Sequence, residues 1–313
     1  MNNLNMIEVN DLIVRFGKFT AVNGLNLCVE KGRAVALLGE NGAGKTTTLR
    51  VIASIIGATR GSGTVLGKPI GELGQQEYAR LGYVSENQKM HNTWTLKRHI
   101  DYLKPMYPTW DDAFCEELII NFDLPLDRKV GAFSRGMQMK AMLVCSLAYR
   151  PELLILDEPF SGLDPLVREE LIDGIIELMQ GGEWTILLSS HDINEVERLC
   201  DSVAIIENGK VSVSEPLDSL QERYRSVDIT VEQPINVEPL PTWLNLNTDN
   251  SSRWSFTVSN FTADSESQLR ELFGNDAVIE SESLSLRDIY LVIAREKKRK
   301  RTAIKKSLTK TSS

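Results

Sequence analysis

The segment best equipped for chemistry is a glycine-rich loop that reads Gly39-Glu40-Asn41-Gly42-Ala43-Gly44-Lys45-Thr46 and fits the pattern G-x-x-x-x-G-K-[ST]. The apolar run Ala34–Leu38 before it predicts a buried strand, and residues 47–56, beginning with Thr47, predict a helix. Strand, loop and helix in this order argue against a plain glycine turn. They predict a site where backbone N–H groups and the positive helix end bind the phosphates of a nucleotide.

Two side chains at the end of this loop are suited to the nucleotide itself. Lys45 is expected to reach the β- and γ-phosphates, and the Thr46 hydroxyl is expected to bind Mg²⁺. Thr47 follows directly at the start of the helix and belongs to the same predicted site. The loop therefore predicts nucleotide and Mg²⁺ binding without saying what the nucleotide is used for.

A pair of carboxylates follows a second short apolar run. Leu153–Leu156 predicts a strand of a buried parallel sheet, and Asp157-Glu158 comes directly after it. Asp157 in that position suits Mg²⁺, and Glu158 is placed to polarise an attacking water. Four apolar residues and two acids are a weak motif alone. The motif gains weight about 110 residues after a phosphate loop, because both would end parallel strands of one sheet.

A third segment, Phe133-Ser134-Arg135-Gly136-Met137-Gln138, opens a predicted helix that runs to Tyr149. A serine hydroxyl and glycine amides at a helix N-terminus predict a second anion site. The chain between this segment and Asp157 is short, so folding back onto the same phosphates is difficult. We expect the second site to serve a nucleotide held by another chain, although Ser-x-Gly also begins many ordinary helices.

The remaining pattern predicts one α/β domain followed by a smaller module. Residues 7–30 favour antiparallel strands, and residues 94–150 favour helices. Asp164-Pro165 predicts a helix start, and His191 lies just beyond a predicted strand at Trp184–Ser189. We place the nucleotide-binding domain at residues 1–225, with a helical subdomain at about 88–150. A small α+β module at 226–294 and a basic, disordered tail at 295–313 follow.

These segments together resemble the ATP-binding subunit of ATP-binding cassette (ABC) transporters over about residues 5–225. Gly39–Thr46 resembles Walker A, Leu153–Glu158 resembles Walker B, and Phe133–Met137 stands at the signature. Ser161-Gly162-Leu163-Asp164 resembles the D-loop, His191 the switch histidine, and Phe16 lies where the family places an aromatic ring under adenine. The form Ser-Arg-Gly-Met and the C-terminal extension are most similar to bacterial export-type members that pair with a separate permease.

The resemblance implies a fold and a mechanism. The fold is α/β, a P-loop NTPase cassette with a RecA-like parallel sheet core, an antiparallel β subdomain and a helical subdomain. Two subunits, identical or different, would hold two ATP molecules head to tail, each between Walker A of one chain and Ser134 and Gly136 of the other. Glu158 would activate water, His191 would contact the γ-phosphate, and Asp164 would couple the two sites.

Two departures from the family pattern concern positions that the resemblance assigns to ligand binding. The loop after the strand Leu81–Val84 carries Glu86 where the family has glutamine, and Gln88 lies two residues on. Glu86 could still face Mg²⁺ or the attacking water, since carboxylates are competent oxygen ligands, and the choice between the two stays open. In the signature, Arg135 replaces a glycine and Met137 replaces a glutamine, while Ser134 and Gly136 are retained.

Composition limits the other classes of function. The 313 residues carry a net charge of −8, yet residues 295–313 hold nine Lys/Arg and one Glu, which leaves an acidic body that does not favour nucleic acid. The basic tail could make weak contact with anionic lipid or could simply aid solubility. The four scattered cysteines indicate a reducing compartment. No signal sequence and no membrane span are evident.

We therefore expect an ATPase subunit of a membrane exporter, bound peripherally to the cytoplasmic side of the membrane through a permease. The alternative is a soluble ABC ATPase that acts on a ribosome, nucleic acid or an assembly scaffold. Against it stand the single cassette, the lack of a long coiled-coil insertion and the acidic body. A regulatory module with degraded catalysis is disfavoured by Lys45, Asp157, Glu158 and His191. The transported substrate cannot be inferred from this chain.

Overall fold

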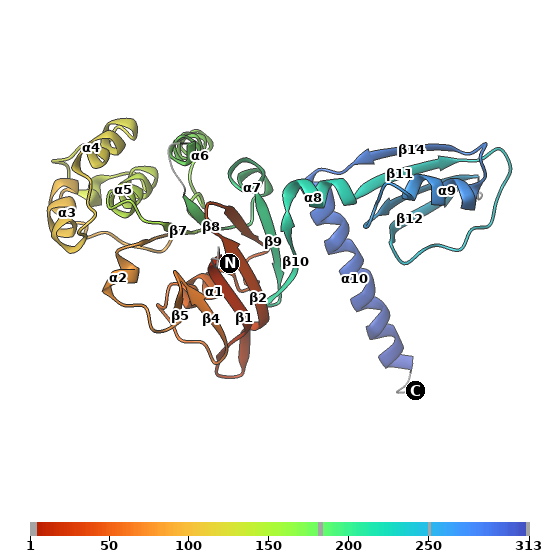
Figure 1. The fold of residues 1–313 in the computed structure, drawn as a ribbon, viewed down its shortest axis with the longest axis horizontal. Helices are drawn as coiled ribbons and strands as arrows, with labels where there is room; N and C mark the ends of the chain where they lie inside the picture. The colour runs from red at the N-terminus through yellow and green to blue at the C-terminus, as the bar shows by residue number, and fades with distance from the viewer. Residues whose placement is uncertain (1–4, 181–183, 250–251, 311–313) are drawn as a thin grey trace. The chain divides into compact units, whose positions relative to one another are not determined.

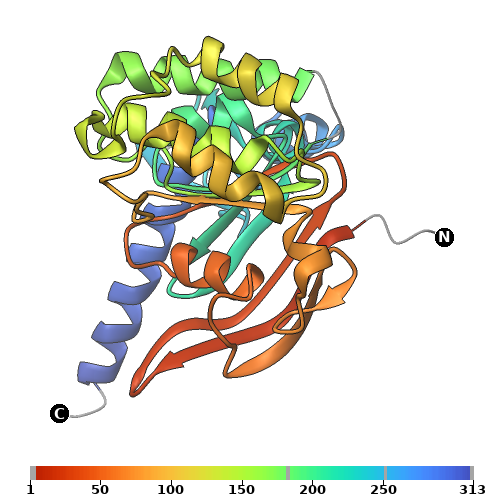
Figure 2. The same ribbon diagram turned by 90° about the vertical axis from the view of Figure 1, so that its left-hand side faces the viewer.

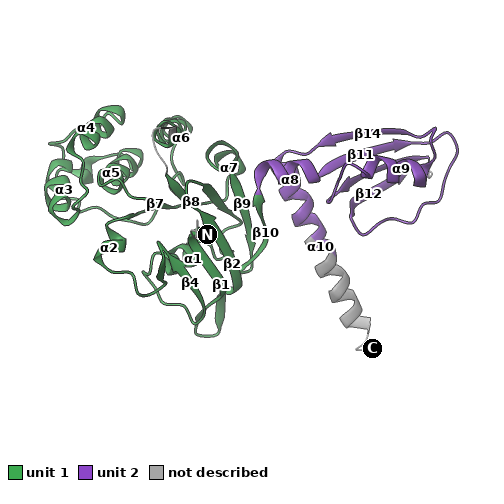
Figure 3. Cartoon of the chain, in the orientation of Figure 1, with its two compact units in different colours: residues 1–215 green, residues 216–313 purple. Residues whose placement is uncertain are grey.

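The computed structural model describes residues 5–180, 184–249 and 252–310 and divides into two compact units, residues 1–215 and 216–313 (Figure 3). The first unit contains a six-stranded sheet with the order β10-β9-β3-β8-β7-β6. Its strands are β3 (Ala34–Leu38), β6 (Leu81–Ser85), β7 (Leu153–Asp157), β8 (Thr185–Ser190), β9 (Ser202–Glu207) and β10 (Lys210–Pro216). Every residue of β3, β7 and β8 is buried, as expected for parallel strands covered on both faces.

The register of these strands brings their carboxyl ends to one edge. Asp157 at the end of β7 lies opposite Ser85 of β6 and Ser189 of β8. Leu38, the last residue before the glycine loop, lies opposite Ser190. Ligands of open α/β sheets bind at this edge. Residues that are more than 100 positions apart in the sequence are thus neighbours there.

A second sheet in the same unit is antiparallel, with the order β2-β1-β4-β5. It consists of β1 (Asn5–Phe16), β2 (Phe19–Glu30), β4 (Arg60–Val65) and β5 (Lys68–Pro69). Helix α1 (Lys45–Ile52) lies in a shared core, because Leu49 and Ile52 are fully buried in one cluster with residues of both sheets. This packing fixes the start of α1, and with it the glycine loop, against the sheet edge.

Several helices complete the first unit, and α3, α4 and α5 lie together, apart from the antiparallel sheet (Figures 1 and 2). Side chains of Thr95, Asp111 and Ser134 cap the N-termini of α3, α4 and α5. The helices are α2 (Gln75–Tyr78), α3 (Leu96–Leu103), α4 (Asp112–Asn121), α5 (Arg135–Leu147), α6 (Pro165–Gln180) and α7 (Ile193–Leu199), with 3₁₀ turns η1 (Lys104–Met106) and η2 (Val130–Ala132).

The second unit has its own antiparallel sheet and its own core. The sheet order is β12-β13-β11-β14, and the core stacks Trp243 on Phe256 and sets Trp254 edge-on to Phe273. Its elements are α8 (Leu217–Arg223), β11 (Arg225–Thr230), β12 (Trp243–Asp249), β13 (Arg253–Val258), α9 (Ser265–Phe273), β14 (Val278–Ser283) and α10 (Leu286–Lys310). No described helix combines the length and apolar character that a membrane span requires.

The boundary and the tail differ from the sequence-based expectation. The units divide between Glu215 and Pro216, not at residue 225, because α8 packs against α10 and β14 of the second unit. The segment from 295 was expected to be disordered, whereas α10 is helical through Lys310. Buried Leu286 and Ile289 anchor its first turns, and the following Ala, Lys, Arg and Glu residues are strong helix formers that extend it. Residues 311–313 lie outside the described structure.

Candidate active site

The glycine loop adopts a backbone that needs glycine at two positions. Gly42 and Gly44 have φ angles of 83° and 110°, in the left-handed region that other residues rarely occupy. A Cβ atom on Gly39 would lie 2.4 Å from the carbonyl oxygen of Ile206. Helix α1 then starts at Lys45 with no side chain capping its first turn among the described residues. Its first N–H groups, including those near Thr46 and Thr47, are therefore available to an anion.

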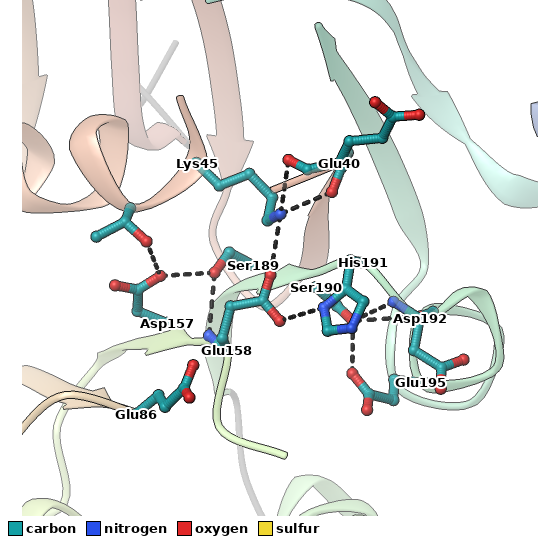
Figure 4. A network of polar contacts seen from close by, with 12 residues as sticks. Glu40, Lys45, Glu86, Asp157, Glu158, Ser189, Ser190, His191, Asp192 and Glu195 are labelled. Carbon is teal, nitrogen blue, oxygen red and sulfur yellow. Dashed lines mark hydrogen bonds and ion pairs between the residues drawn. The ribbon is translucent and has the colours of Figure 1, made fainter. Parts of the chain in front are cut away.

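Lys45 is buried at the sheet edge and is held by three oxygens (Figure 4). Its Nζ donates to the carbonyl oxygens of Gly39 at 2.6 Å and Glu40 at 3.2 Å. The same Nζ lies 2.9 Å from Glu158 Oε1. A buried cation surrounded by acceptors keeps its charge aimed at the loop, where phosphates would bind.

Asp157 is the centre of a group of hydroxyls. Thr46 Oγ1 donates to Asp157 Oδ1 at 2.9 Å, and Ser189 Oγ donates to the same oxygen at 2.8 Å. Tyr83 and Ser85 donate to Oδ2, each at 3.4 Å. Among the described residues, no three His, Cys, Asp or Glu side chains converge on a metal position. A hydroxyl beside one buried carboxylate still fits Mg²⁺, which binds to few protein oxygens and takes others from water and phosphate.

Glu158 lies between Lys45 and His191. Its Oε2 is 2.7 Å from His191 Nδ1, so the imidazole donates to the carboxylate from that nitrogen (Figure 4). The backbone of Glu158 has a φ of 52°, which is uncommon for a residue with a side chain and is often found at functional sites. Its N–H is held by the carbonyl and hydroxyl oxygens of Ser189 at 3.2 and 3.1 Å. The side chain is thus oriented from both ends.

Two serines after the apolar part of β8 were not predicted as site residues. Ser189 is fully buried and links Asp157 Oδ1 to the Glu158 N–H. Ser190 Oγ donates to Glu195 Oε2 at 2.5 Å (Figure 4). Burial raises the pKa of Glu195. The feature of the sequence that could have predicted these two serines was a pair of hydroxyls at the carboxyl end of an otherwise apolar strand. That edge is where parallel sheets bind ligands.

The predicted second anion site lies at the start of α5. Ser134 is exposed and its Oγ accepts the Met137 N–H at 3.2 Å, which leaves the hydroxyl hydrogen free to donate. Gly136 is required by close packing, since a Cβ there would lie 2.4 Å from Val167 Cγ1 of α6. Among the described contacts, none joins Ser134 or Met137 to the glycine loop of the same chain. Service to a second chain stays a prediction.

The two candidates in the loop after β6 have separate surroundings. Glu86 donates its N–H to the Asp157 carbonyl at 3.0 Å, while its Oε1 lies 2.6 Å from Arg135 NH2. Gln88 Oε1 accepts the Ser85 N–H at 3.4 Å, and Gln88 lines a cavity of about 580 Å³. The Glu86 carboxylate therefore pairs with Arg135 in this structure, and its assignment to Mg²⁺ stays a prediction.

Two further candidates lie on the rim. Phe16 is 55% exposed at the end of β1 and pairs across the hairpin with Phe19, which is 63% exposed and was not singled out from the sequence. Asp164 accepts the Val167 N–H at 3.1 Å and so caps α6. Two exposed rings at one hairpin tip offer a stacking surface, which is compatible with the adenine role expected for Phe16.

Comparison with known proteins identifies the family. The ABC transporter family model matches residues 22–161, which include the glycine loop, Asp157 and Glu158. A model described as an AAA domain, a putative AbiEii toxin of a type IV toxin–antitoxin system, matches residues 126–197. The ABC transporter ATP-binding protein NatA of Bacillus subtilis (strain 168) is 35% identical over 234 residues, 72% of this chain and 95% of its own length. The chain belongs to the ABC transporter ATP-binding family.

Other relatives and solved structures agree. The Bacillus subtilis ABC transporter ATP-binding protein YtrB is 30% identical over 74% of this chain and 79% of its own. The bacitracin transport ATP-binding protein BcrA of Bacillus licheniformis is 32% identical over 70% of this chain and 72% of its own. A solved ATP-binding subunit of an ABC transporter is 32% identical, with a TM-score of 0.62 over 69% of this chain and 92% of that one.

Membership confirms the predicted cassette fold and the general activity. This ABC protein is an ATP-binding subunit of a transporter and an ATPase of the P-loop class. None of the relatives reported above supports the soluble alternative. The individual site residues are placed by the geometry described above, and their roles in hydrolysis are proposed below.

Proposed function

We propose that this ABC subunit hydrolyses ATP to power export through a separate permease on the cytoplasmic face of the membrane. The observation that carries the hydrolytic part is the position of Glu158, held between Lys45 and His191 beside the Thr46–Asp157 pair. A transport function is supported by the relative named for bacitracin transport, and the outward direction by the resemblance of the signature segment and C-terminal extension to export-type members. The cargo is chosen by the permease and not by this chain.

The roles that we propose for these residues in ATP hydrolysis follow from their charges. Lys45 and the N–H groups of the glycine loop bind and orient the phosphates, since donors aimed at developing charge need no rearrangement during reaction. Glu158 orients the attacking water and accepts its proton, and His191 holds the Glu158 carboxylate in place. Thr46 and Asp157 would hold Mg²⁺, which would supply positive charge to neutralise the phosphates.

A head-to-tail pair of subunits would complete each site. At the start of α5, Ser134 is exposed and Gly136 packs tightly against Val167. No described contact joins Ser134 to the glycine loop of its own chain. A helix N-terminus with a free hydroxyl hydrogen suits the γ-phosphate of ATP held by a second chain. Asp164, at the start of α6, would lie at the same interface. The second chain is either another copy or a related subunit.

Membrane fractionation of native cells tests the transporter function. This ABC subunit should sediment with the membranes and be released by conditions that dissociate peripheral proteins. It should also co-purify with a multi-span protein. A wholly soluble pool bound to ribosomes would contradict the proposal. A variant that lacks residues 296–313 tests whether the basic segment contacts lipid. If the fraction of the variant that sediments with membranes is unchanged, the segment serves solubility and not lipid binding.

A further inference from the structure

Arg135 joins three segments of the first unit that are distant in sequence. Its NH2 lies 2.6 Å from Glu86 Oε1, in the loop after β6. Its guanidinium also covers Gly162, because a Cβ atom on that glycine would lie 2.3 Å from NH1 and 2.7 Å from Cζ. Gly162 has a φ of 65°, so the position favours glycine for its backbone as well as for space. The planar head of Arg135 is therefore held between a carboxylate and a bare backbone.

Both partners of Arg135 lie in loops that are joined by a backbone hydrogen bond to Asp157 or Glu158, at the carboxyl end of β7. The Glu86 N–H donates to the Asp157 carbonyl at 3.0 Å. On the other side, the Ser161 N–H donates to the Glu158 carbonyl at 3.2 Å, directly before Gly162. Two routes thus run from Asp157 and Glu158, through different loops, to the same guanidinium.

The backbone of Arg135 belongs to the proposed second anion site. Ser134 and Gly136 flank it at the start of α5, and Gly136 packs on Val167 in the first turn of α6. The backbone of this helix start is consequently fixed by side-chain contacts that originate next to Asp157 and Glu158. A movement of either loop would be passed to the N–H groups and hydroxyl that face a second chain.

We propose that Arg135 is a positioning residue that couples the ATP site of its own chain to the anion site that the same chain offers to its partner. The inference rests on the proposed two-chain function. An arginine suits this task, because its planar fork binds a carboxylate while its face packs on a backbone, and a lysine offers neither geometry. In a dimer, each subunit would then close over its partner's ATP only when its own strand end and loops are correctly arranged.

A simpler role would be a direct electrostatic one, in which Arg135 and Glu86 act separately on phosphate and on Mg²⁺. The two roles predict different results from a double-mutant cycle, which isolates the energy of one pair. If the pair acts as a unit, removing either member destroys the coupling, and removing both costs little more. If the members act separately, their effects multiply.

The experiment measures ATP-driven dimerisation of the full chain carrying Glu158→Gln, which is designed to bind ATP without hydrolysing it. Arg135→Gln, Glu86→Gln and the double variant are compared by sedimentation over a range of Mg-ATP concentrations. We expect each single variant to raise the half-maximal ATP concentration for dimerisation about tenfold, which is within the usual range of coupling between contacting residues. The value for the double variant should remain within about twofold of the higher of the two single-variant values. Effects of the two single variants that multiply in the double variant would overturn the proposal.

A matched control and a folding check make the result specific. Lys97→Gln removes an exposed ion pair with Asp101 on α3 and should leave dimerisation unchanged. The side chains of Arg135 and Glu86 are 51% and 30% exposed, so their loss should hardly alter the melting temperature. If the chain with Glu158→Gln alone fails to dimerise with ATP, the two-chain function fails, and this inference with it. If that chain dimerises but the cycle is multiplicative, only the role of Arg135 is refuted.

Discussion

Glu158 contacts Lys45 through one carboxylate oxygen and His191 through the other, at 2.9 and 2.7 Å. A single acidic side chain thus bridges Lys45, which we propose binds phosphates, and His191, which directly follows β8. The contacts restrain both rotation and position, which a water-activating carboxylate requires. The unusual φ of Glu158 is held by the hydrogen bonds of its N–H to Ser189.

Replacing Glu158 by Gln should separate ATP binding from hydrolysis. The amide keeps the shape of the side chain but cannot accept a proton from water. We expect ATP binding to persist, ATP-dependent dimers to accumulate, and turnover to fall by about 100-fold or more, as for loss of a general base. Phosphate release and sedimentation measure the two effects. Turnover close to that of the unaltered chain would refute the role of Glu158.

Replacing Lys45 by Ala should weaken nucleotide binding. The buried ammonium lies at the glycine loop, 2.9 Å from Glu158 Oε1, and hydrogen bonds from an ammonium to phosphate oxygens are strong. We expect ATP affinity to fall by about 10- to 150-fold, the equivalent of about 1.5–3 kcal/mol. Titration with a fluorescent ATP analogue measures it, with Lys97→Ala on the exposed face of α3 as the control. Equal affinities in the two variants would count against the phosphate-loop assignment.

Ser189→Ala should lower stability and activity together. The variant removes the buried hydroxyl that donates to Asp157 Oδ1 and accepts the Glu158 N–H. The Glu158 N–H keeps the Ser189 carbonyl and Asp157 Oδ1 keeps the Thr46 hydroxyl, so the loss is that of two hydrogen bonds. Each contributes about 0.5–1.5 kcal/mol, and we expect the free energy of unfolding to fall by about 1–3 kcal/mol. Urea unfolding and ATP turnover are the measurements. Ser212→Ala on β10 removes an exposed hydroxyl that donates to one backbone carbonyl, that of Ile205 at 3.2 Å, and should cost less and leave turnover unchanged; an equal effect at both sites would contradict the linking role of Ser189.

His99 should make stability fall in mild acid. Its Nε2 accepts the His91 N–H at 3.0 Å and its Nδ1 is 2.9 Å from the Thr95 carbonyl, so both nitrogens are used by the neutral ring. Burial lowers the pKa of His99 below its ordinary value of about 6.5. As pH falls below about 6.5, the unfolded chain takes up the proton first, and the stabilisation present at higher pH is lost.

The variant His99→Gln tests this dependence. It loses the hydrogen bonds at every pH but cannot gain the proton, so the difference in melting temperature from the unaltered chain should shrink between pH 7.5 and 5.5. Thermal melting at several pH values measures the difference. A gap that stays constant or widens towards acid would show that His99 does not contribute this pH dependence.

Charge repulsion in the second unit can be relieved. Asp228 of β11 lies directly opposite Glu280 of β14, and both are exposed on the same face of the sheet. Like charges opposite one another destabilise a sheet, so Glu280→Lys should raise stability by about 0.2–1 kcal/mol, with a smaller gain in high salt. Chemical unfolding measures the gain. Glu266→Lys on α9 removes a charge paired with Arg270 and should give no such gain; equal gains would point to net charge instead.

Much of the active site could be predicted because its motifs are local. The left-handed backbone at Gly42 and Gly44 needs glycine, and the loop directly precedes α1, so spacing alone reveals the phosphate-binding geometry. The same holds for Asp157, which ends an apolar strand, and for Glu158, which directly follows it. By contrast, Ser189 was missed because its role depends on the register of β8 beside β7, which sets it opposite Asp157.

The amino-acid sequence by itself predicted a loop that binds nucleotide phosphates, and the order of its motifs carried the resemblance to the family, because short segments with a fixed backbone carry that information. Only the tertiary structure decided that Glu86 pairs with Arg135, that Arg135 covers Gly162, and that α8 belongs to the second unit. It also decided that α10 continues through the basic segment. Each of these depends on which distant segments pack together, and long-range packing leaves no fixed spacing in the sequence.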